Sequence, residues 1–109
     1  MTLVELKQIL DRTGYPVAYY QFNVDENNPA PTLPFIVYLV DSTANYFSDD
    51  KLLKKVDNVL IELYTDNKDL IAEQKLESLL NDNEICWNVD EVFIESEKMF
   101  QRIYTTTIF

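Results

Sequence analysis

The stretch Met99-Phe100-Gln101-Arg102-Ile103-Tyr104-Thr105-Thr106-Thr107-Ile108-Phe109 carries the clearest periodic pattern in the sequence. Its side chains alternate in character, which is typical of a β-strand, because successive residues of a strand point to opposite faces of a sheet. The apolar set on one parity is Phe100, Tyr104 and Ile108, and the other parity holds Gln101, Ile103, Thr105 and Thr107. We therefore expect residues 99–109 to be paired within a sheet.

Several earlier stretches are also typical of strands, because they are rich in β-branched and aromatic residues. A turn at Ser96–Lys98 precedes the last strand. Continuous apolar runs such as Phe35–Val40 indicate strands that are covered or central. The expected strands before the turn are Val17–Phe22, Phe35–Val40, Val59–Tyr64 and two short runs, Ile85–Trp87 and Val92–Ile94.

The first expected helix covers residues 3–13. Thr2 and Glu5 form an S/T-x-x-E capping box before an apolar stripe that includes Leu6 and Leu10. Gly14 stands where a helix C-terminus favours a left-handed residue, and Pro16 prevents the helix from continuing.

The second expected helix covers residues 67–81. Asp66 is the predicted N-cap, and Asp69 lies in the first turn, where a negative charge complements the helix dipole. The predicted buried stripe is Ala72, Leu76, Leu79 and Leu80, and Asn81–Asn83 ends the helix.

With the two short runs of residues 85–94 taken together, these elements follow one another in the order α-β-β-β-α-β-β. Consecutive strands with short links favour antiparallel pairing, with helices packed on the sheet. The sequence therefore predicts an α+β fold, a mostly antiparallel sheet with two helices, in one domain of residues 1–109. Asp41–Lys55 is polar apart from a central Tyr46-Phe47 pair, and its pattern indicates no definite element.

Composition excludes many kinds of chemistry. The 109 residues include no histidine, one cysteine (Cys86) and one glycine (Gly14). Histidine-based nucleophile pairs, His-ligated metal sites, internal disulfides and glycine-rich phosphate loops are therefore absent. A net charge of −10 argues against direct nucleic-acid binding, and no apolar stretch is long enough to span a membrane. We expect no cofactor, no bound transition metal and no enzymatic activity.

The acidic clusters do not match known site patterns. Asp25-x-Asn27 resembles the start of a calcium loop, but the sixth and twelfth positions are Ala30 and Ile36 instead of glycine and glutamate. The glutamates Glu91, Glu95 and Glu97 indicate an outward polar face. Cys86 beside Trp87 is interpreted as a core pair.

Two loops are the predicted protein-binding surface. Asn23–Leu33 is stiffened by prolines, so it loses little entropy on docking, whereas Asp41–Asp50 is polar and carries two large aromatic side chains. The candidate interface residues are Asp25, Glu26, Asn27, Tyr46, Phe47, Asp49 and Asp50, with Tyr46 and Phe47 as anchors. Alternatively, Tyr46 and Phe47 cover the protein's own core. Tyr19, Tyr20 and Phe22 are either core residues or part of an interface.

Four segments in order carry a family resemblance: GYPVAY at 14–19 with Phe22, PFIVY at 34–38, IELYTDNKD at 61–69, and IESEK at 94–98 with Tyr104. The chain resembles the small tail-terminator, or tail-completion (head-tail joining), proteins of long-tailed phages and prophages of Gram-positive bacteria. Asp41–Lys55 matches the family least well.

The resemblance implies a structural virion protein without catalysis. Such proteins cap the head-proximal end of the tail tube as a ring, commonly six-fold, and join it to the head-side connector. It implies a location in the virion tail after assembly in the host cytoplasm. With a net charge of −10, we expect a monomer or weak oligomer in dilute solution that closes into a ring on the tube.

An inhibitor of a host nuclease that mimics DNA is the alternative function. Its carboxylates would imitate phosphates and bind a basic cleft. Such a mimic needs one dense acidic face, whereas five lysines interleave with the acidic residues: Lys51, Lys54, Lys55, Lys75 and Lys98.

Overall fold

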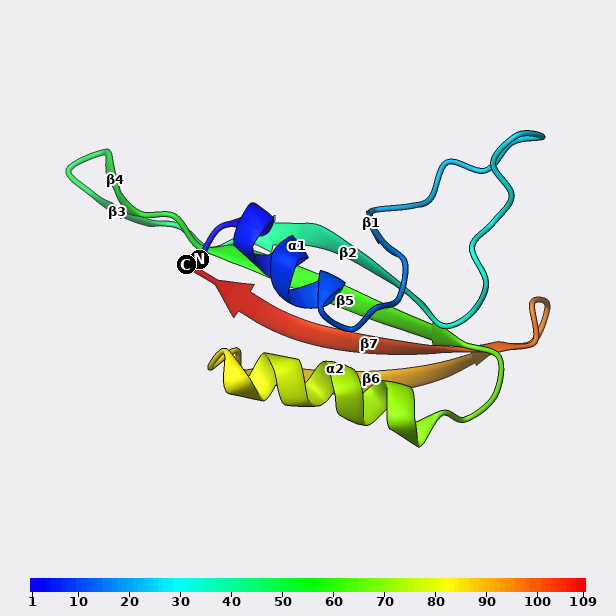
Figure 1. The fold of residues 1–109 in the computed structure, drawn as a ribbon. Helices are drawn as coiled ribbons and strands as arrows, with labels where there is room; N and C mark the ends of the chain where they lie inside the picture. Colours follow the sequence, from blue (N-terminus) through cyan, green and yellow to red (C-terminus); the bar gives the residue numbers. More distant parts are fainter.

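The computed structural model describes residues 1–109 as two helices and seven strands (Figure 1). Helix α1 spans Leu3–Asp11 and helix α2 spans Leu70–Asp82. The strands are β1 (Val17–Tyr19), β2 (Phe35–Thr43), β3 (Tyr46–Ser48), β4 (Lys51–Lys54), β5 (Asp57–Thr65), β6 (Trp87–Ile94) and β7 (Met99–Ile108).

Five strands form the main sheet, in the spatial order β1-β2-β5-β7-β6. Adjacent strands of this sheet run antiparallel, except β1 and β2, which run parallel. The predicted α+β fold is confirmed, and the helices and main-sheet strands follow the predicted order α-β-β-β-α-β-β. Strands β3 and β4 add a separate hairpin within Asp41–Lys55, the segment without a clear sequence pattern.

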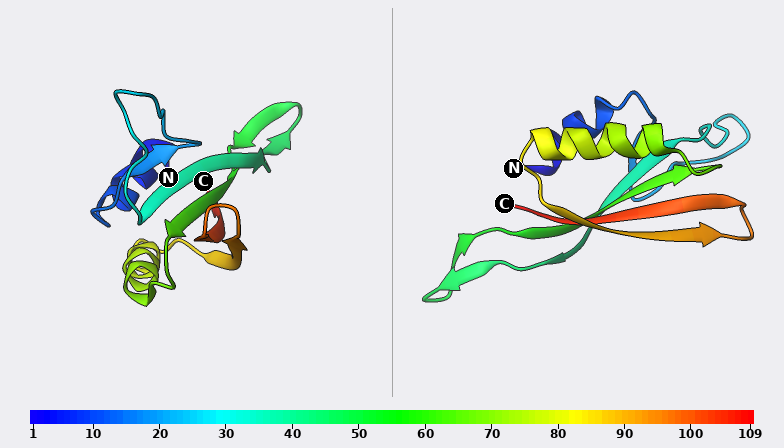
Figure 2. Two further views of the ribbon diagram at one scale, coloured as in Figure 1. Left: turned by 90° about the vertical axis from the view of Figure 1, so that its right-hand side faces the viewer. Right: turned by 90° about the horizontal axis from the view of Figure 1, so that it is seen from below.

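Both helices cover the same face of the sheet, as the right-hand view of Figure 2 shows. Strand β5 alternates strictly, with its odd-numbered residues buried and its even-numbered residues half-buried. The core joins side chains of α1, α2 and the central strands, including Leu6, Leu10, Ile61, Leu76, Leu80 and Tyr104. Burial of these apolar side chains fixes the helices on the sheet.

The start of α1 agrees with its sequence signals. Thr2 Oγ1 accepts a hydrogen bond from the Glu5 backbone N at 3.1 Å, and Glu5 Oε1 accepts one from the Thr2 backbone N at 3.3 Å. This reciprocal pair is the predicted capping box. Gly14 has a φ of +82°, as expected for a left-handed residue that follows a helix.

Helix α2 begins later than predicted. Its N-cap is Asp69, whose Oδ1 accepts a hydrogen bond from the Ala72 backbone N at 3.0 Å, and the predicted N-cap Asp66 is wrong. Because β5 continues to Thr65, residues 66–68 form the link from strand to helix. The end of the helix at Asn83 is as predicted.

Several boundaries and one burial differ from the sequence prediction. Helix α1 ends at Asp11 instead of residue 13, and β5 covers Asp57–Thr65 instead of Val59–Tyr64. Strand β1 ends at Tyr19, because Tyr20 adopts a positive φ of 69°. The two short strands predicted in residues 85–94 are one continuous strand, β6, and β2 extends to Thr43. Cys86 is exposed, so its predicted burial with Trp87 is wrong, although the Trp87 ring packs edge-on against Tyr104 at 5.2 Å.

Neither helix combines the length and the apolar character that a membrane-crossing helix requires.

Candidate protein interface

The β3–β4 hairpin projects from one end of the molecule (Figure 1). Every residue of its two strands is exposed. Ser48 pairs with Lys51, so only Asp49 and Asp50 form the turn, and both have positive φ values of 50° and 62°. Positive φ at both central residues is the geometry of a type I′ turn, whose twist matches that of the flanking strands. Asp41–Lys55 is thus mostly strand and hairpin, and the interpretation of Asp41–Asp50 as a loop is wrong.

The base of the hairpin is fixed to the body. The Val56 backbone N donates a hydrogen bond to Asn45 Oδ1 at 2.8 Å, and the Ala44 backbone N donates to the Val56 carbonyl at 2.9 Å. Val56 is itself 5 % exposed, so this closure is anchored in the protein interior. The Lys54 ammonium lies 4.1 Å from the centre of the Phe109 ring. These contacts hold the hairpin in a defined direction.

Four large apolar side chains of the hairpin are exposed to solvent. The exposed fractions are 63 % for Tyr46, 64 % for Phe47, 53 % for Leu52 and 70 % for Leu53. Phe47 and Leu52 are cross-strand partners, so they share one face. The alternative in which Tyr46 and Phe47 cover the protein's own core is therefore wrong. Exposed apolar groups this close together are typical of interaction surfaces.

Sequence reasoning missed Leu52 and Leu53 as members of this surface. Their signal was an apolar pair between lysines, in a segment that already contained two exposed aromatic residues. The hairpin segment 46–55 contains three lysines and two aspartates, which give it a net charge of +1 in a chain of net charge −10.

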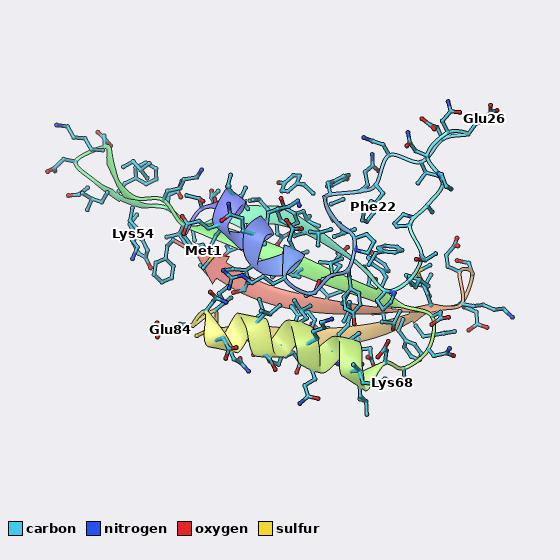
Figure 3. All side chains as sticks on the ribbon, in the orientation of Figure 1. Met1, Phe22, Glu26, Lys54, Lys68 and Glu84 are labelled. Atoms are coloured by element: carbon cyan, nitrogen blue, oxygen red, sulfur yellow. The ribbon has the colours of Figure 1, made fainter.

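The other predicted loop lies at the opposite end of the molecule. Figure 3 shows Glu26 at the tip of this loop and Lys54 on the hairpin, on opposite sides of the body. Asp25, Glu26 and Asn27 are exposed. The predicted site residues therefore form two separate groups, and the structure does not bring the groups together.

Asp25 has a structural role within this loop. Its Oδ1 accepts hydrogen bonds from the backbone N of Asn27 at 2.8 Å and of Asn28 at 2.7 Å. These bonds, the one from Asn27 foremost, hold the pKa of the Asp25 carboxyl below its usual value. The carboxylate organises the turn of the loop.

An apolar hollow of about 280 Å³ lies between this loop and the sheet. Seven of its nine lining residues are hydrophobic, including Tyr20, Phe22, Val24, Phe35 and Tyr64, and Pro31 also lines it. The Phe35 ring stacks on Tyr64 at 5.0 Å, and the Phe22 ring meets Phe35 edge-on at 5.3 Å. The sequence indicated that Tyr20 and Phe22 belong to a core or an interface, but only the folded loop places them beside Pro31 and Tyr64.

The charged side chains near α2 form an ion-pair network. Arg102 lies 3.1 Å from Glu77 and 3.4 Å from Glu73, and Lys68 lies 2.8 Å from both Glu73 and Glu91. The Tyr104 hydroxyl donates to Glu77 Oε2 at 2.6 Å and accepts from Arg102 Nε at 2.9 Å. Burial, together with the hydrogen bond to Glu77, raises the pKa of Tyr104. The network links α2 to β6 and β7.

No group of three or more His, Cys, Asp or Glu side chains is arranged to hold a metal ion. The Glu91 carboxylate forms ion pairs with Lys68 at 2.8 Å and with Arg102 at 3.5 Å, so its negative charge is balanced within the chain. The features of the structure that could bind another molecule are the exposed hairpin and the distant apolar hollow.

A scan against protein-family models and a search of curated proteins found no match to this chain.

Proposed function

We propose that this protein is a structural subunit of a phage tail, which caps the head-proximal end of the tail tube as a ring and joins it to the head-side connector. The observation that carries the proposal is the anchored β3–β4 hairpin, with its four exposed apolar side chains. Such a projection supports a role in protein docking, and the sequence resemblance to tail-terminator proteins supplies the partners: the tube protein, the connector and further copies of the chain.

The physical logic of termination agrees with this role. A tube of stacked rings stops growing when a subunit fits its last ring but does not repeat the tube's own surface. The net charge of −10 opposes premature self-association in solution, because like charges repel at long range. The proposal assigns the protein to the virion tail, with assembly in the host cytoplasm, and assigns it no catalysis, cofactor or nucleic-acid contact.

The alternative, an inhibitor that mimics DNA, requires a dense and unpaired acidic face. In the structure Glu73, Glu77 and Glu91 are paired with Lys68 or Arg102. Three lysines also lie on and beside the projecting hairpin. These observations favour the tail proposal over the mimic.

The proposal is tested by electron microscopy of the protein mixed with tail tubes of the phage that encodes it. We expect a ring at one end of each tube. Tyr46→Ala/Phe47→Ala should stay folded, with a free energy of unfolding within about 0.5 kcal/mol of wild type, because both side chains are exposed. It should nevertheless fail to cap the tubes, because the anchors are lost.

The matched control is Val4→Ala/Ile71→Ala, which shortens two side chains that are 68 % and 78 % exposed on the helices. This variant should cap tubes like wild type. Normal capping by Tyr46→Ala/Phe47→Ala would exclude the hairpin as the docking element. Absence of wild-type protein from tube ends would exclude the proposed function.

A further inference from the structure

The β3–β4 hairpin and the loop 20–34, which lines the apolar hollow, lie at opposite ends of an elongated molecule (Figure 1). Its principal extents are 50 × 31 × 25 Å. Within one chain the hairpin therefore cannot reach the hollow. We propose that the β3–β4 hairpin of one copy docks into the hollow between loop 20–34 and the sheet of the next copy. This inference deepens the proposed function, on which it rests for the ring, by naming the partner of the hairpin as a second copy of this chain.

The two surfaces agree in their apolar character. Phe47 and Leu52 share one face of the hairpin and lack apolar cover in their own chain. The hollow has about 280 Å³ of open volume between mostly hydrophobic walls. Tyr20 and Val24 lie at the hollow with 65 % and 58 % of their surfaces exposed. Docking removes both exposed apolar sets from water in one contact.

The charges favour a second copy as the occupant. The hairpin segment 46–55 has a net charge of +1, whereas the loop segment 20–34 has two acidic residues, Asp25 and Glu26, and no basic ones. Figure 3 shows Glu26 at the loop tip and Lys54 on the hairpin, at opposite ends of the molecule. The turn of the hairpin carries Asp49 and Asp50, so its positive charge lies on the lysines of β4 and on the adjacent Lys55. Attraction between these lysines and the acidic loop offsets locally the repulsion between two chains of net charge −10.

The contact joins two different surfaces, so it is head-to-tail. A head-to-tail contact leaves one hairpin and one hollow free at the ends of every open chain of subunits. In a closed ring, every hairpin is docked in the hollow of a neighbouring subunit and none is left free. The inference thus explains how one projecting hairpin per subunit produces a closed ring.

Cross-linking between two single-cysteine variants tests the contact directly. The exposed native thiol is first removed by Cys86→Ser. In that background, Ser48→Cys places a thiol on β3 beside Phe47, and Ala30→Cys places one on the lining of the hollow. A short bismaleimide added to an equal mixture of these two variants at about 0.15 M salt, where the long-range repulsion is screened, should produce a covalent dimer.

The matched control replaces Ala30→Cys with Ser78→Cys, an exposed position on α2 outside the proposed contact. This mixture should give about tenfold less dimer. Adding Phe47→Ala to the Ser48→Cys variant should lower the dimer yield of the first mixture about tenfold. Loss of a buried aromatic anchor typically weakens binding by about 1.4 kcal/mol or more, which is a factor of about ten in affinity. Equal yields in the test and control mixtures would overturn the inference.

A charge exchange gives a second, independent readout. Lys51→Glu on the hairpin variant should lower the dimer yield, and Glu26→Lys on the hollow variant should restore it. Asp25 is left unchanged, because its carboxylate holds the turn of the loop. Absence of restoration would contradict the proposed charge pairing.

Repeating the cross-linking with tail tubes present distinguishes failure of this inference from failure of the proposed function. Capping without a Ser48–Ala30 cross-link, or a cross-link from Ser48→Cys to the tube protein instead, would overturn the head-to-tail contact and leave the tail role standing. A specific cross-link between copies that never cap a tube would support the contact and exclude the tail role.

Discussion

Gly14 is the one glycine of the chain, and it occupies a position whose backbone demands it. Its φ of +82° lies in the left-handed region just after α1. A Cβ built there would meet only the Lys75 Nζ at 4.0 Å, which is ordinary contact. The requirement for glycine is therefore set by backbone conformation and not by lack of space.

We predict that Gly14→Ala lowers the free energy of unfolding by about 1 kcal/mol, because an L-residue pays to adopt this conformation. Gly14→Asn should lose less, because asparagine tolerates the left-handed region better. Urea unfolding of the three proteins measures the order. A Gly14→Ala variant as stable as wild type would show that the chain can relax to another turn here.

Four tyrosines with raised pKa values couple the fold to alkaline pH, and the shifts are largest for Tyr64 and Tyr104. Burial, followed by the hydrogen bond to Glu62, raises the pKa of Tyr64 to about 12, and burial also raises that of Tyr104. The unfolded chain ionises its tyrosines near pH 10, at about the ordinary pKa of the phenol. Their contribution to stability is therefore full below about pH 10 and is lost as pH rises through the folded pKa.

We predict that the urea midpoint falls between about pH 10 and pH 12, and that Tyr64→Phe makes this fall shallower, because one of the linked protons is gone. At neutral pH the same variant should lose about 1 kcal/mol, since Tyr64 also accepts a hydrogen bond from Gln101. If the urea midpoint of Tyr64→Phe fell with pH as steeply as that of wild type, Tyr64 would not be one of the groups that link stability to alkaline pH.

At the scale of the elements, the start of α2 depends on which aspartate caps it. Asp69 bonds the Ala72 backbone N, whereas Asp66 lies exposed outside the helix. We predict that Asp69→Ala costs about 1 kcal/mol of stability, the usual cost of a lost N-cap. Asp66→Ala, the matched control, should change stability by less than about 0.5 kcal/mol. Thermal unfolding followed by circular dichroism compares them, and equal losses would contradict the assigned cap.

Elements with strong local signals were predictable from the sequence. The Thr2–Glu5 capping box and the alternation of residues 99–108 specify their structures through neighbouring residues, and both are confirmed. The start of α2 was missed because Asp66 and Asp69 are both good caps, and the length of β5 decides between them. The sequence predicts two pieces for strand β6, because polar residues interrupt its apolar pattern on the exposed side.

The hairpin could not be derived from local sequence. Its Asp49–Asp50 turn lacks the glycine that usually marks a type I′ turn, and a register irregularity between Tyr46 and Phe47 breaks the alternation. The aromatic anchors were recognisable as costly to leave in water. The hollow was not recognisable, because it exists only where loop 20–34 folds over Phe35 and Tyr64.

At the scale of the whole molecule, charge and shape act in opposite directions on self-association. The net charge of −10 repels copies at distances up to the Debye length, which is about 30 Å at 0.01 M salt and about 3 Å at 1 M salt. The apolar contact proposed between hairpin and hollow acts only at close range. Salt therefore weakens the long-range repulsion more than it weakens the packed contact.

We predict that the protein sediments as a monomer in dilute solution at about 0.01 M salt and shifts toward larger species at about 1 M salt, as screening removes the repulsion. Tyr46→Ala/Phe47→Ala should remain monomeric at both salt concentrations, because screening helps only where an apolar contact can form. Val4→Ala/Ile71→Ala should follow wild type, since its truncated side chains lie on the helices. Tight rings of wild-type protein at low salt, without tube protein, would contradict the prediction, because they would show that the contact outweighs the full repulsion of the chains. Larger species that form equally in the hairpin variant would show that salt drives association through another surface.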